Sequence, residues 1–169
     1  AARGIVLPEG AADGDDLTSV RGIGNRKNRV FTEVLERDGI EAYPGTLHLL
    51  ERLGELGAAV AVVSSSRNAE PVLRAAGLRE RFPVVVDGVV AEREGLPGKP
   101  EPDTYLRAAL LLRADPSRCV VLEDAASGVA AGKNGDFGCV VGVDRGAGAT
   151  ALREAGAHLV VRDLEELVA

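Results

Sequence analysis

The chain has 169 residues, enough for one ordinary domain or for one domain with part of another. Hydrophobic residues make up 46% of it and aromatic residues only 3%, so a core is possible but must be built from Val, Leu and Ala. The net charge of −6 argues against a nucleic-acid partner, and the absence of any apolar run near ~18 residues argues against a membrane span.

The first part of the chain is predicted to be a loop followed by helices. Residues 1–16 are rich in Gly and Asp, which is typical of a loop. From about Asn25 to Arg37, apolar residues recur at helical spacing. A turn at residues 43–46 begins a second helix, with an apolar stripe of Leu47, Leu50, Leu53 and Leu56. Since no strand precedes this turn, we place a boundary there, between residues 1–43 and residues 44–169.

After the boundary, apolar strands alternate with helices. The predicted strands are residues 58–63, 83–86, 118–123, 139–143 and 158–161. The predicted helices are 68–76, 103–113, 125–133 and 149–155, with a closing turn at 164–168 and a small hairpin arm at 89–93. This alternation implies right-handed crossovers. The fold class is therefore α/β, a Rossmann-like three-layer parallel sheet.

Two features bear on the compartment and on the extent of the chain. Cys119 and Cys139 each begin a predicted strand, which favours buried free thiols in a reducing cytoplasm over a disulfide or a metal pair. A signal peptide is not predicted at the amino end. The sequence contains no Met and opens on Ala-Ala-Arg, so we expect either a fragment of a longer protein or a sequence with internal breaks.

Three polar segments follow the predicted strands, and in an open parallel sheet ligands bind outside the carboxyl ends of the strands. Ser64, Ser65 and Ser66 offer hydroxyl and backbone donors to an anion, although taken alone they are more typical of a helix cap or a turn. Arg67 and Asn68 would suit a second phosphate. Lys99 is braced by Gly98 and Pro100, although a solvated loop lysine is the simpler interpretation.

Adjacent carboxylates end the strand at 118–123. Glu123 and Asp124 repel each other unless a cation joins them, and hard divalent cations such as Mg²⁺ prefer these oxygens. The alternative is that Asp124 only caps the following helix. One phosphate and one divalent cation together would indicate phosphoryl transfer.

These residues resemble the haloacid dehalogenase superfamily, in particular its β-phosphoglucomutase-like phosphatases. The resemblance rests on Ser64 after AVAVV, on GKPEPDTY at 98–105 and on VVLEDAASGVAAGKNG at 120–135, which look like the second, third and fourth motifs of that superfamily. It spans residues 44 to about 145. It implies a Mg²⁺-dependent phosphatase or mutase that acts on a small phosphorylated metabolite.

The resemblance also implies a role for each residue. Ser64 would bind the transferring phosphate and Lys99 would neutralise its charge, while Glu123 and Asp124 would hold Mg²⁺. The other end of the substrate would be bound by Ser65, Ser66, Arg67 and Asn68. Residues 1–43 would be a remnant of a helical cap, from which Arg26 and Lys27 could reach the substrate.

The first motif of the superfamily, an apolar strand followed by Asp-x-Asp-Gly-Thr, has no good counterpart here. No apolar strand precedes Asp13-Gly14-Asp15-Asp16, and Thr18 is out of register. We expect that the aspartate nucleophile lies upstream, that its strand is central to the sheet, and that residues 1–169 alone are inactive.

Two other interpretations remain. Residues 146–151 satisfy the glycine fingerprint of dinucleotide-binding folds, and Asp163 could then contact a ribose, but two residues separate the strand from the glycines. Alternatively, the protein is a non-catalytic module that binds phosphate or sugar phosphate, or an inactive paralogue.

Overall fold

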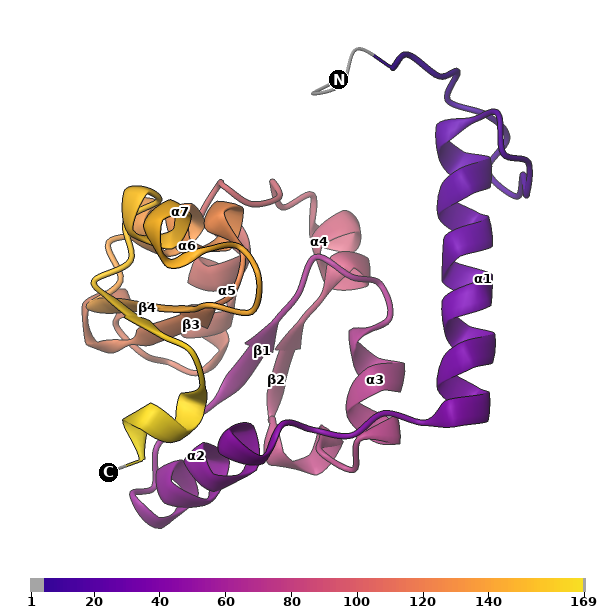
Figure 1. The fold of residues 1–169 in the computed structure, drawn as a ribbon. Helices are drawn as coiled ribbons and strands as arrows, with labels where there is room; N and C mark the ends of the chain where they lie inside the picture. Colours follow the sequence, from indigo (N-terminus) through magenta and orange to yellow (C-terminus); the bar gives the residue numbers. More distant parts are fainter. Residues whose placement is uncertain (1–4, 169) are drawn as a thin grey trace. The chain divides into compact units, whose positions relative to one another are not determined.

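The computed structural model describes residues 5–168, and the chain divides into two compact units, Ala1–Ile40 and Glu41–Ala169 (Figure 1). The division lies close to the turn at Pro44. All strands defined within residues 5–168 belong to the second unit. Among the helices of that described part, none is both long and apolar enough to cross a membrane.

The first unit contains a loop and one long helix, α1 (Val20–Asp38). The helix begins earlier than its apolar spacing predicts, because the Ser19 side chain caps it by accepting a hydrogen bond from the Gly22 N–H at 3.1 Å. It ends at Gly39, whose φ of 69° is one that glycine adopts readily.

Five strands run through the second unit. They are β1 (Ala61–Val63), β2 (Val84–Val86), β3 (Val120–Glu123), β4 (Cys139–Val143) and β5 (Leu159–Val161). One sheet pairs β1 with β2, and the other has the order β3-β4-β5, with every pairing parallel. The predicted α/β class with parallel strands is confirmed.

The helices of the second unit are α2 (Pro44–Glu55), α3 (Ala69–Ala75), α4 (Gly88–Glu94), α5 (Asp103–Leu111), α6 (Ala126–Asn134) and α7 (Ala149–Glu154), with short 3₁₀ turns η1 (Arg79–Arg81), η2 (Pro116–Arg118) and η3 (Leu164–Leu167). Some of them cover both faces of the three-stranded sheet (Figure 1). Residues of α5, α6 and α7 pack in one core cluster with Val121 and Val140. Leu49 of α2 and Leu164 of η3 pack in another with Val141. Neighbouring residues of β4 thus face opposite layers, as the pleat requires.

The apolar stripe predicted for α2 is correct for Leu53 and wrong for Leu47 and Leu56. The helix contacts the core through Leu49, which is buried, and through Leu53, whereas Leu47 and Leu56 are exposed. The reason is that α2 packs against η3, so that only the side carrying Leu49 and Leu53 faces the sheet.

The hairpin arm predicted at residues 89–93 is also wrong, because this segment is the helix α4. One oxygen of the Asp87 carboxylate accepts hydrogen bonds from the N–H groups of Val89 and Val90, at 3.0 and 2.9 Å. Gly95 ends the helix in the left-handed region with φ 65°. The capping aspartate outweighs the β-forming tendency of the two valines.

The sheet is interrupted between β1 and β3. In the described part of the chain, β1 pairs only with β2 and β3 only with β4. On β3 the side chains of Val120 and Leu122 are 60% and 38% exposed. This arrangement leaves one edge of β1 and one edge of β3 unpaired within residues 5–168.

Both cysteines are free thiols, as predicted, but each is only partly buried, whereas the sequence predicted buried thiols. Cys119 packs against the cluster that contains Val121, and Cys139 against the cluster on the opposite face of the sheet. The sheet therefore separates the two side chains.

Candidate active site

A cavity of about 510 Å³ lies at the carboxyl ends of β1, β3 and β4. It is lined by Thr46, Val63, Ser64, Ser65, Ser66, Lys99, Leu122, Glu123, Asp124, Ala125, Ser127, Val143, Arg145 and Leu164. The structure thus brings together the hydroxyl cluster, the lysine and the paired carboxylates that the sequence places after separate strands.

Lys99 is fixed by two side chains at once. Its Nζ lies 2.6 Å from Glu123 Oε2, and the two side chains are only 10% and 11% exposed. Tyr105 on α5 donates its hydroxyl to the same oxygen at 2.5 Å. The Lys99 Nζ also lies 4.7 Å from the centroid of the Tyr105 ring, within the range of a cation–π contact. The ammonium group therefore has a defined position at the edge of the cavity.

The protonation states of this cluster follow from its contacts. Burial opposes the charge on Glu123, but hydrogen bonds from Lys99 and Tyr105 outweigh it and hold the pKa of the carboxyl below its usual value. Burial, together with the negative charge of Glu123, raises the pKa of the Tyr105 hydroxyl. Tyr105 therefore remains a neutral donor and Glu123 an ionised acceptor at physiological pH.

One small residue after Asp124 is required by the packing of Glu123. The Ala125 N–H donates to Glu123 Oε1 at 3.1 Å. A Cβ atom at position 128 would collide with the Glu123 carboxyl group, so Gly128 on α6 is the residue that leaves room for it.

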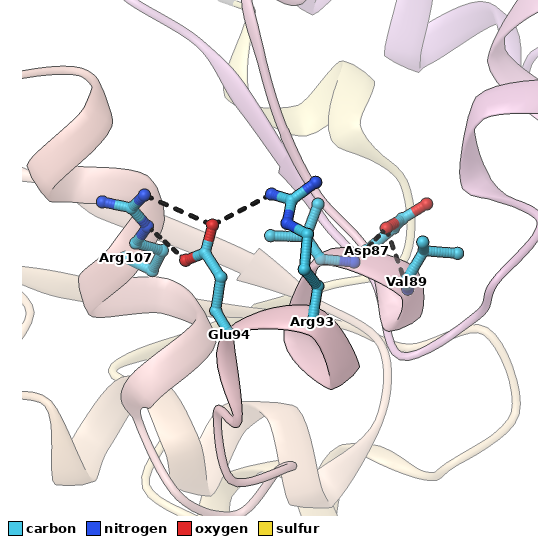
Figure 2. A network of polar contacts seen from close by, with 6 residues as sticks. Asp87, Val89, Arg93, Glu94 and Arg107 are labelled. Atoms are coloured by element: carbon cyan, nitrogen blue, oxygen red, sulfur yellow. Dashed lines mark hydrogen bonds and ion pairs between the residues drawn. The ribbon is translucent and has the colours of Figure 1, made fainter.

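The loop that carries Lys99 joins two helices that an ion-pair network holds together. Figure 2 shows the carboxylate of Glu94, the last residue of α4, between the guanidinium groups of Arg93, also on α4, and Arg107 on α5. Its oxygens lie 3.0 Å from Arg93 Nη2 and 2.7 Å from Arg107 Nε. Hydrogen bonds from Arg107 and then Arg93 lower the pKa of Glu94. By tying α4 to α5, Glu94 restricts the loop between them.

The serine cluster forms a turn before α3 and does not cap that helix, whose N-cap residue is Asn68. Ser64 Oγ accepts a hydrogen bond from the Ser66 N–H, and Ser66 Oγ accepts one from the Asn68 N–H, both at 3.1 Å. These are turn-stabilising bonds in which the hydroxyl oxygens act only as acceptors. Each hydroxyl can still donate its own hydrogen, so Ser64 and Ser66 remain able to bind an anion in the cavity.

Two predicted substrate-binding residues lie outside the lining of this cavity, and two others belong to the first unit. Among residues 5–168, neither Arg67 nor Asn68 belongs to the lining of this cavity, and Arg67 forms an ion pair with Glu92 at 2.7 Å. Arg26 and Lys27 are exposed on α1 in the first unit. Their contact with a substrate remains a prediction.

The aspartates near the amino end serve α1. Asp16 accepts hydrogen bonds from the N–H and hydroxyl of Thr18 and from the Ser19 hydroxyl, each at 2.8 Å. The bonds from Thr18 and then Ser19 lower the pKa of Asp16 to about 2. Asp15 forms an ion pair with Arg29. Both carboxylates thus have structural partners in the first unit, which agrees with their rejection as a nucleophile motif.

The carboxylates at the tip of β3 suit a hard cation but do not complete a site for one. Asp124 is exposed at the cavity, and the one hydrogen bond to Glu123 Oε1 among residues 5–168 comes from the Ala125 N–H. In the described part of the chain, no cluster of three or more His, Cys, Asp or Glu side chains is arranged to hold a metal. Any Mg²⁺ bound here needs a further ligand.

The glycine fingerprint at residues 146–151 has a structural explanation. The Asp144 carboxylate accepts hydrogen bonds from the N–H groups of Gly146 and Gly148, at 3.3 and 3.0 Å. These groups are therefore engaged within the loop rather than open to a pyrophosphate, which argues against the dinucleotide-binding interpretation.

Sequence reasoning missed Tyr105, Thr46, Ser127 and Arg145. Tyr105 belongs to the GKPEPDTY segment and could have been found from it. Arg145 follows the strand at 139–143, so the same strand-end argument that selected Ser64 also applies to it. Thr46 carried no signal beyond its place in a turn.

Comparisons with known proteins agree with one another. The haloacid dehalogenase-like hydrolase family matches residues 8–136. A β-phosphoglucomutase of Mycobacterium bovis is 45% identical over 170 residues, which cover 98% of this chain and 65% of that protein. Hexitol phosphatase A of Escherichia coli is 40% identical over 136 residues, 80% of this chain and 60% of that protein. The chain thus spans less than two thirds of the length of these relatives.

A solved structure shares the fold. CbbY of Rhodobacter sphaeroides, in complex with xylulose-(1,5)-bisphosphate, superposes with a TM-score of 0.77 and 25% sequence identity. The superposition covers 90% of this chain and 67% of that chain.

Proposed function

The chain belongs to the haloacid dehalogenase-like hydrolases, in their β-phosphoglucomutase-like branch, and on this basis we propose that it is the phosphate-binding core of a phosphoryl-transfer enzyme. Its activity would be that of a Mg²⁺-dependent phosphatase or sugar-phosphate mutase. Its substrate would be a small phosphorylated metabolite. The relatives named as a β-phosphoglucomutase and a hexitol phosphatase support this class.

One observation carries the proposal. Ser64, Asp124 and the Lys99–Glu123 pair come from separate segments and line a single cavity. In this site Lys99 holds a positive charge against the transferring phosphate, and Ser64 donates a hydrogen bond to it. Glu123 and Tyr105 act as positioning residues, because they fix the ammonium group from the side.

The carboxylate of Asp124 and the second lone pair of Glu123 Oε1 would hold Mg²⁺. The ion would supply positive charge to the phosphate oxygens when bound. Lys99 supplies charge to the same oxygens from its fixed position, so the equatorial charge of the transition state would be neutralised from two directions.

The nucleophile is proposed to be an aspartate on a strand outside the 169 residues. Support comes from the unpaired edges of β1 and β3 and from the structural partners of Asp15 and Asp16. A strand inserted between β1 and β3 would end beside Ser64 and Asp124. Its carboxylate would attack phosphorus in line and displace the alcohol of the substrate, giving an acyl phosphate. The phosphoryl group would then be transferred to water in a phosphatase or to a sugar hydroxyl in a mutase, which regenerates the carboxylate.

Residues 1–43 are proposed to be part of a helical cap, with Arg26 and Lys27 available to the substrate. This assignment is supported by the separate compact unit and by the family match, which reaches back to residue 8.

The 169-residue chain alone is expected to show no turnover of p-nitrophenyl phosphate, because the attacking carboxylate is missing. A longer version that includes an upstream strand ending in Asp-x-Asp is expected to turn it over in the presence of Mg²⁺. The test is to measure the rate of p-nitrophenyl phosphate turnover by both proteins. An Asp→Asn change at the first aspartate of that motif in the longer protein is the control. Mg²⁺-dependent turnover by the 169-residue chain that Lys99→Ala abolishes would overturn the assignment of the nucleophile.

The same comparison tests the non-catalytic alternative, which the lack of a carboxylate nucleophile near Ser64 favours. If the upstream sequence has no apolar strand ending in Asp-x-Asp, and the longer protein binds phosphate without turnover, the protein is a binding module or an inactive paralogue.

Tyr105→Phe in the longer protein is expected to lower turnover about tenfold, since a hydrogen bond to a charged group is lost. The acid limb of the pH–rate profile is expected to move to higher pH. The reason is that the Tyr105 bond lowers the pKa of Glu123, so its loss lets Glu123 become protonated, and release Lys99, at a higher pH. Tyr105→Leu, which also removes the ring beneath Lys99, is expected to have a larger effect. An unchanged acid limb would contradict the positioning role.

A further inference from the structure

The Lys99 loop, residues 95–102, is held by a side chain that lies outside it. Asn134 is the last residue of α6, and its Nδ2 donates a hydrogen bond to the Pro100 carbonyl oxygen at 3.0 Å. Glu123, at the end of β3, pairs with the Lys99 ammonium group. Asn134 therefore holds the backbone directly after Lys99, while Glu123 holds the end of the lysine side chain.

The Pro100 carbonyl belongs to a tight turn. The Glu101 N–H donates to the Gly98 carbonyl oxygen at 3.1 Å, so Lys99 and Pro100 are the two central residues of this turn. Proline has no N–H, and its carbonyl is the one backbone group through which a neighbouring element can hold it by a strong hydrogen bond. A bond to that oxygen fixes the orientation of the turn and hence the direction in which the Lys99 side chain leaves it.

The end of α6 also supports the residues that follow Pro100. A Cβ atom at position 135 would lie 2.8 Å from Phe137 Cε2 and 3.0 Å from Pro102 Cβ, so Gly135 is the residue that lets both lie close to the helix end. The Phe137 ring packs edge-on against the Tyr105 ring, with centroids 5.9 Å apart and planes at 67°. The end of α6 and the residues after it thus support the Lys99 loop and the start of α5 at three points.

We propose that Asn134 is a positioning residue, which keeps Lys99 at the phosphate site by holding the Pro100 carbonyl. This inference rests on the proposed function, because it takes Lys99 to be the group that neutralises the transferring phosphate. Lys99 lies on a loop, so neither a helix nor a strand sets the position of its backbone. A charge that stabilises a transition state must be oriented in advance, and the flexible side chain of lysine can be oriented only from a fixed backbone.

Two measurements on the longer protein that includes the upstream strand test the inference. The first is the rate at which acetic anhydride acetylates Lys99, measured by mass spectrometry of proteolytic peptides. Lys27 and Lys133, which are exposed, serve as internal references in the same sample. The second measurement gives kcat and KM for p-nitrophenyl phosphate at saturating Mg²⁺.

The variants are Asn134→Ala, which removes the bond, and Asn134→Gln, whose amide can still donate. Alanine is a better helix former than asparagine, so Asn134→Ala does not weaken α6 itself. Asn25→Ala is the matched control. Asn25 on α1 also donates its side-chain amide to loop carbonyls, those of Ala12 and Gly14, at 2.9 and 2.8 Å.

In Asn134→Ala, Lys99 is expected to be acetylated about fivefold faster, because the loss of one hydrogen bond increases the fraction of molecules in which the loop has opened. Lys27 and Lys133 are expected to react at unchanged rates. The value of kcat is expected to fall about fivefold, since the misplaced charge is needed most in the transition state. KM is expected to change by less than about twofold.

Asn134→Gln is expected to show smaller changes in both measurements, and Asn25→Ala none. If Asn134 acts through the lysine, adding Asn134→Ala to Lys99→Ala should change the remaining rate by less than about twofold. This non-additivity distinguishes positioning of Lys99 from a general loss of structure.

Three results would overturn the inference while the proposed function stands. In the first, Asn134→Ala leaves kcat and the acetylation of Lys99 unchanged. In the second, all three lysines react faster by the same factor. In the third, Asn134→Ala lowers the rate of Lys99→Ala by a further factor of about five. If instead Lys99→Ala alone keeps a near-normal rate, the proposed function fails and the inference fails with it.

Discussion

Lys99→Ala is expected to lower turnover of p-nitrophenyl phosphate by about 1,000-fold or more in a version of the protein that includes the nucleophile strand. Lys99 is the positive side chain of the cavity that a buried carboxylate and an aromatic ring both hold in place. Its removal takes away charge stabilisation that is already oriented before the reaction begins. Steady-state rates at saturating Mg²⁺ measure the loss.

Lys99→Ala also leaves Glu123 buried without its cation, so folding must be checked separately by thermal unfolding. Removing one partner of such a pair is destabilising, whereas replacing both partners with neutral groups of similar shape need not be. The double variant Lys99→Met, Glu123→Gln is therefore expected to recover stability but not turnover. Lys133→Ala, an exposed lysine on α6, is the matched control and should keep its rate. Recovery of turnover in the double variant would mean that the ion pair is only structural.

Asp124→Asn is expected to lower turnover by about 100-fold or more, because the substitution keeps the shape of the side chain and removes the charge that attracts a divalent cation. The concentration of Mg²⁺ that gives half-maximal rate is expected to rise at the same time. A Mg²⁺ titration of the rate measures both effects.

Asp136→Asn is the control for this change. Asp136 is exposed after α6, outside the cavity lining, and its φ of 53° is one that asparagine tolerates. The turnover rate and the Mg²⁺ dependence of the Asp136→Asn variant should match those of the unaltered protein. A near-normal rate and an unchanged Mg²⁺ requirement in Asp124→Asn would remove Asp124 from the metal site and support its simpler interpretation as a residue at the start of a helix.

The positions of Ser64, Lys99 and Asp124 could be predicted because they depend on local patterns. Short apolar runs predict strands, and parallel strands end at one edge of a sheet, so polar residues after them converge. The motif resemblance then related them to phosphoryl transfer. For Ser64 and Asp124 the first two conditions are set within a few residues, whereas Lys99 lies between α4 and α5 and was found from its motif. All three line one cavity, and their roles stay predictions.

The features that were missed depend on contacts between distant parts of the chain. The stacking of Arg145 on Tyr43 joins residues from opposite ends of the second unit, and no spacing rule relates them. The pairing of Glu123 with Lys99 and Tyr105, which fixes the lysine, likewise appears only when α5 packs beside β3. For α4, a single capping carboxylate decided between helix and hairpin, a difference too small for residue propensities to resolve.

A crystal structure of the 169-residue chain grown with Mg²⁺ and inorganic phosphate tests most directly whether these strand ends form one phosphate site. We expect the phosphate to lie within hydrogen-bonding distance of Ser64 Oγ and Lys99 Nζ, with the metal ion on Asp124. Phosphate bound away from Ser64 and Lys99, or a metal ion held without Asp124, would contradict the account.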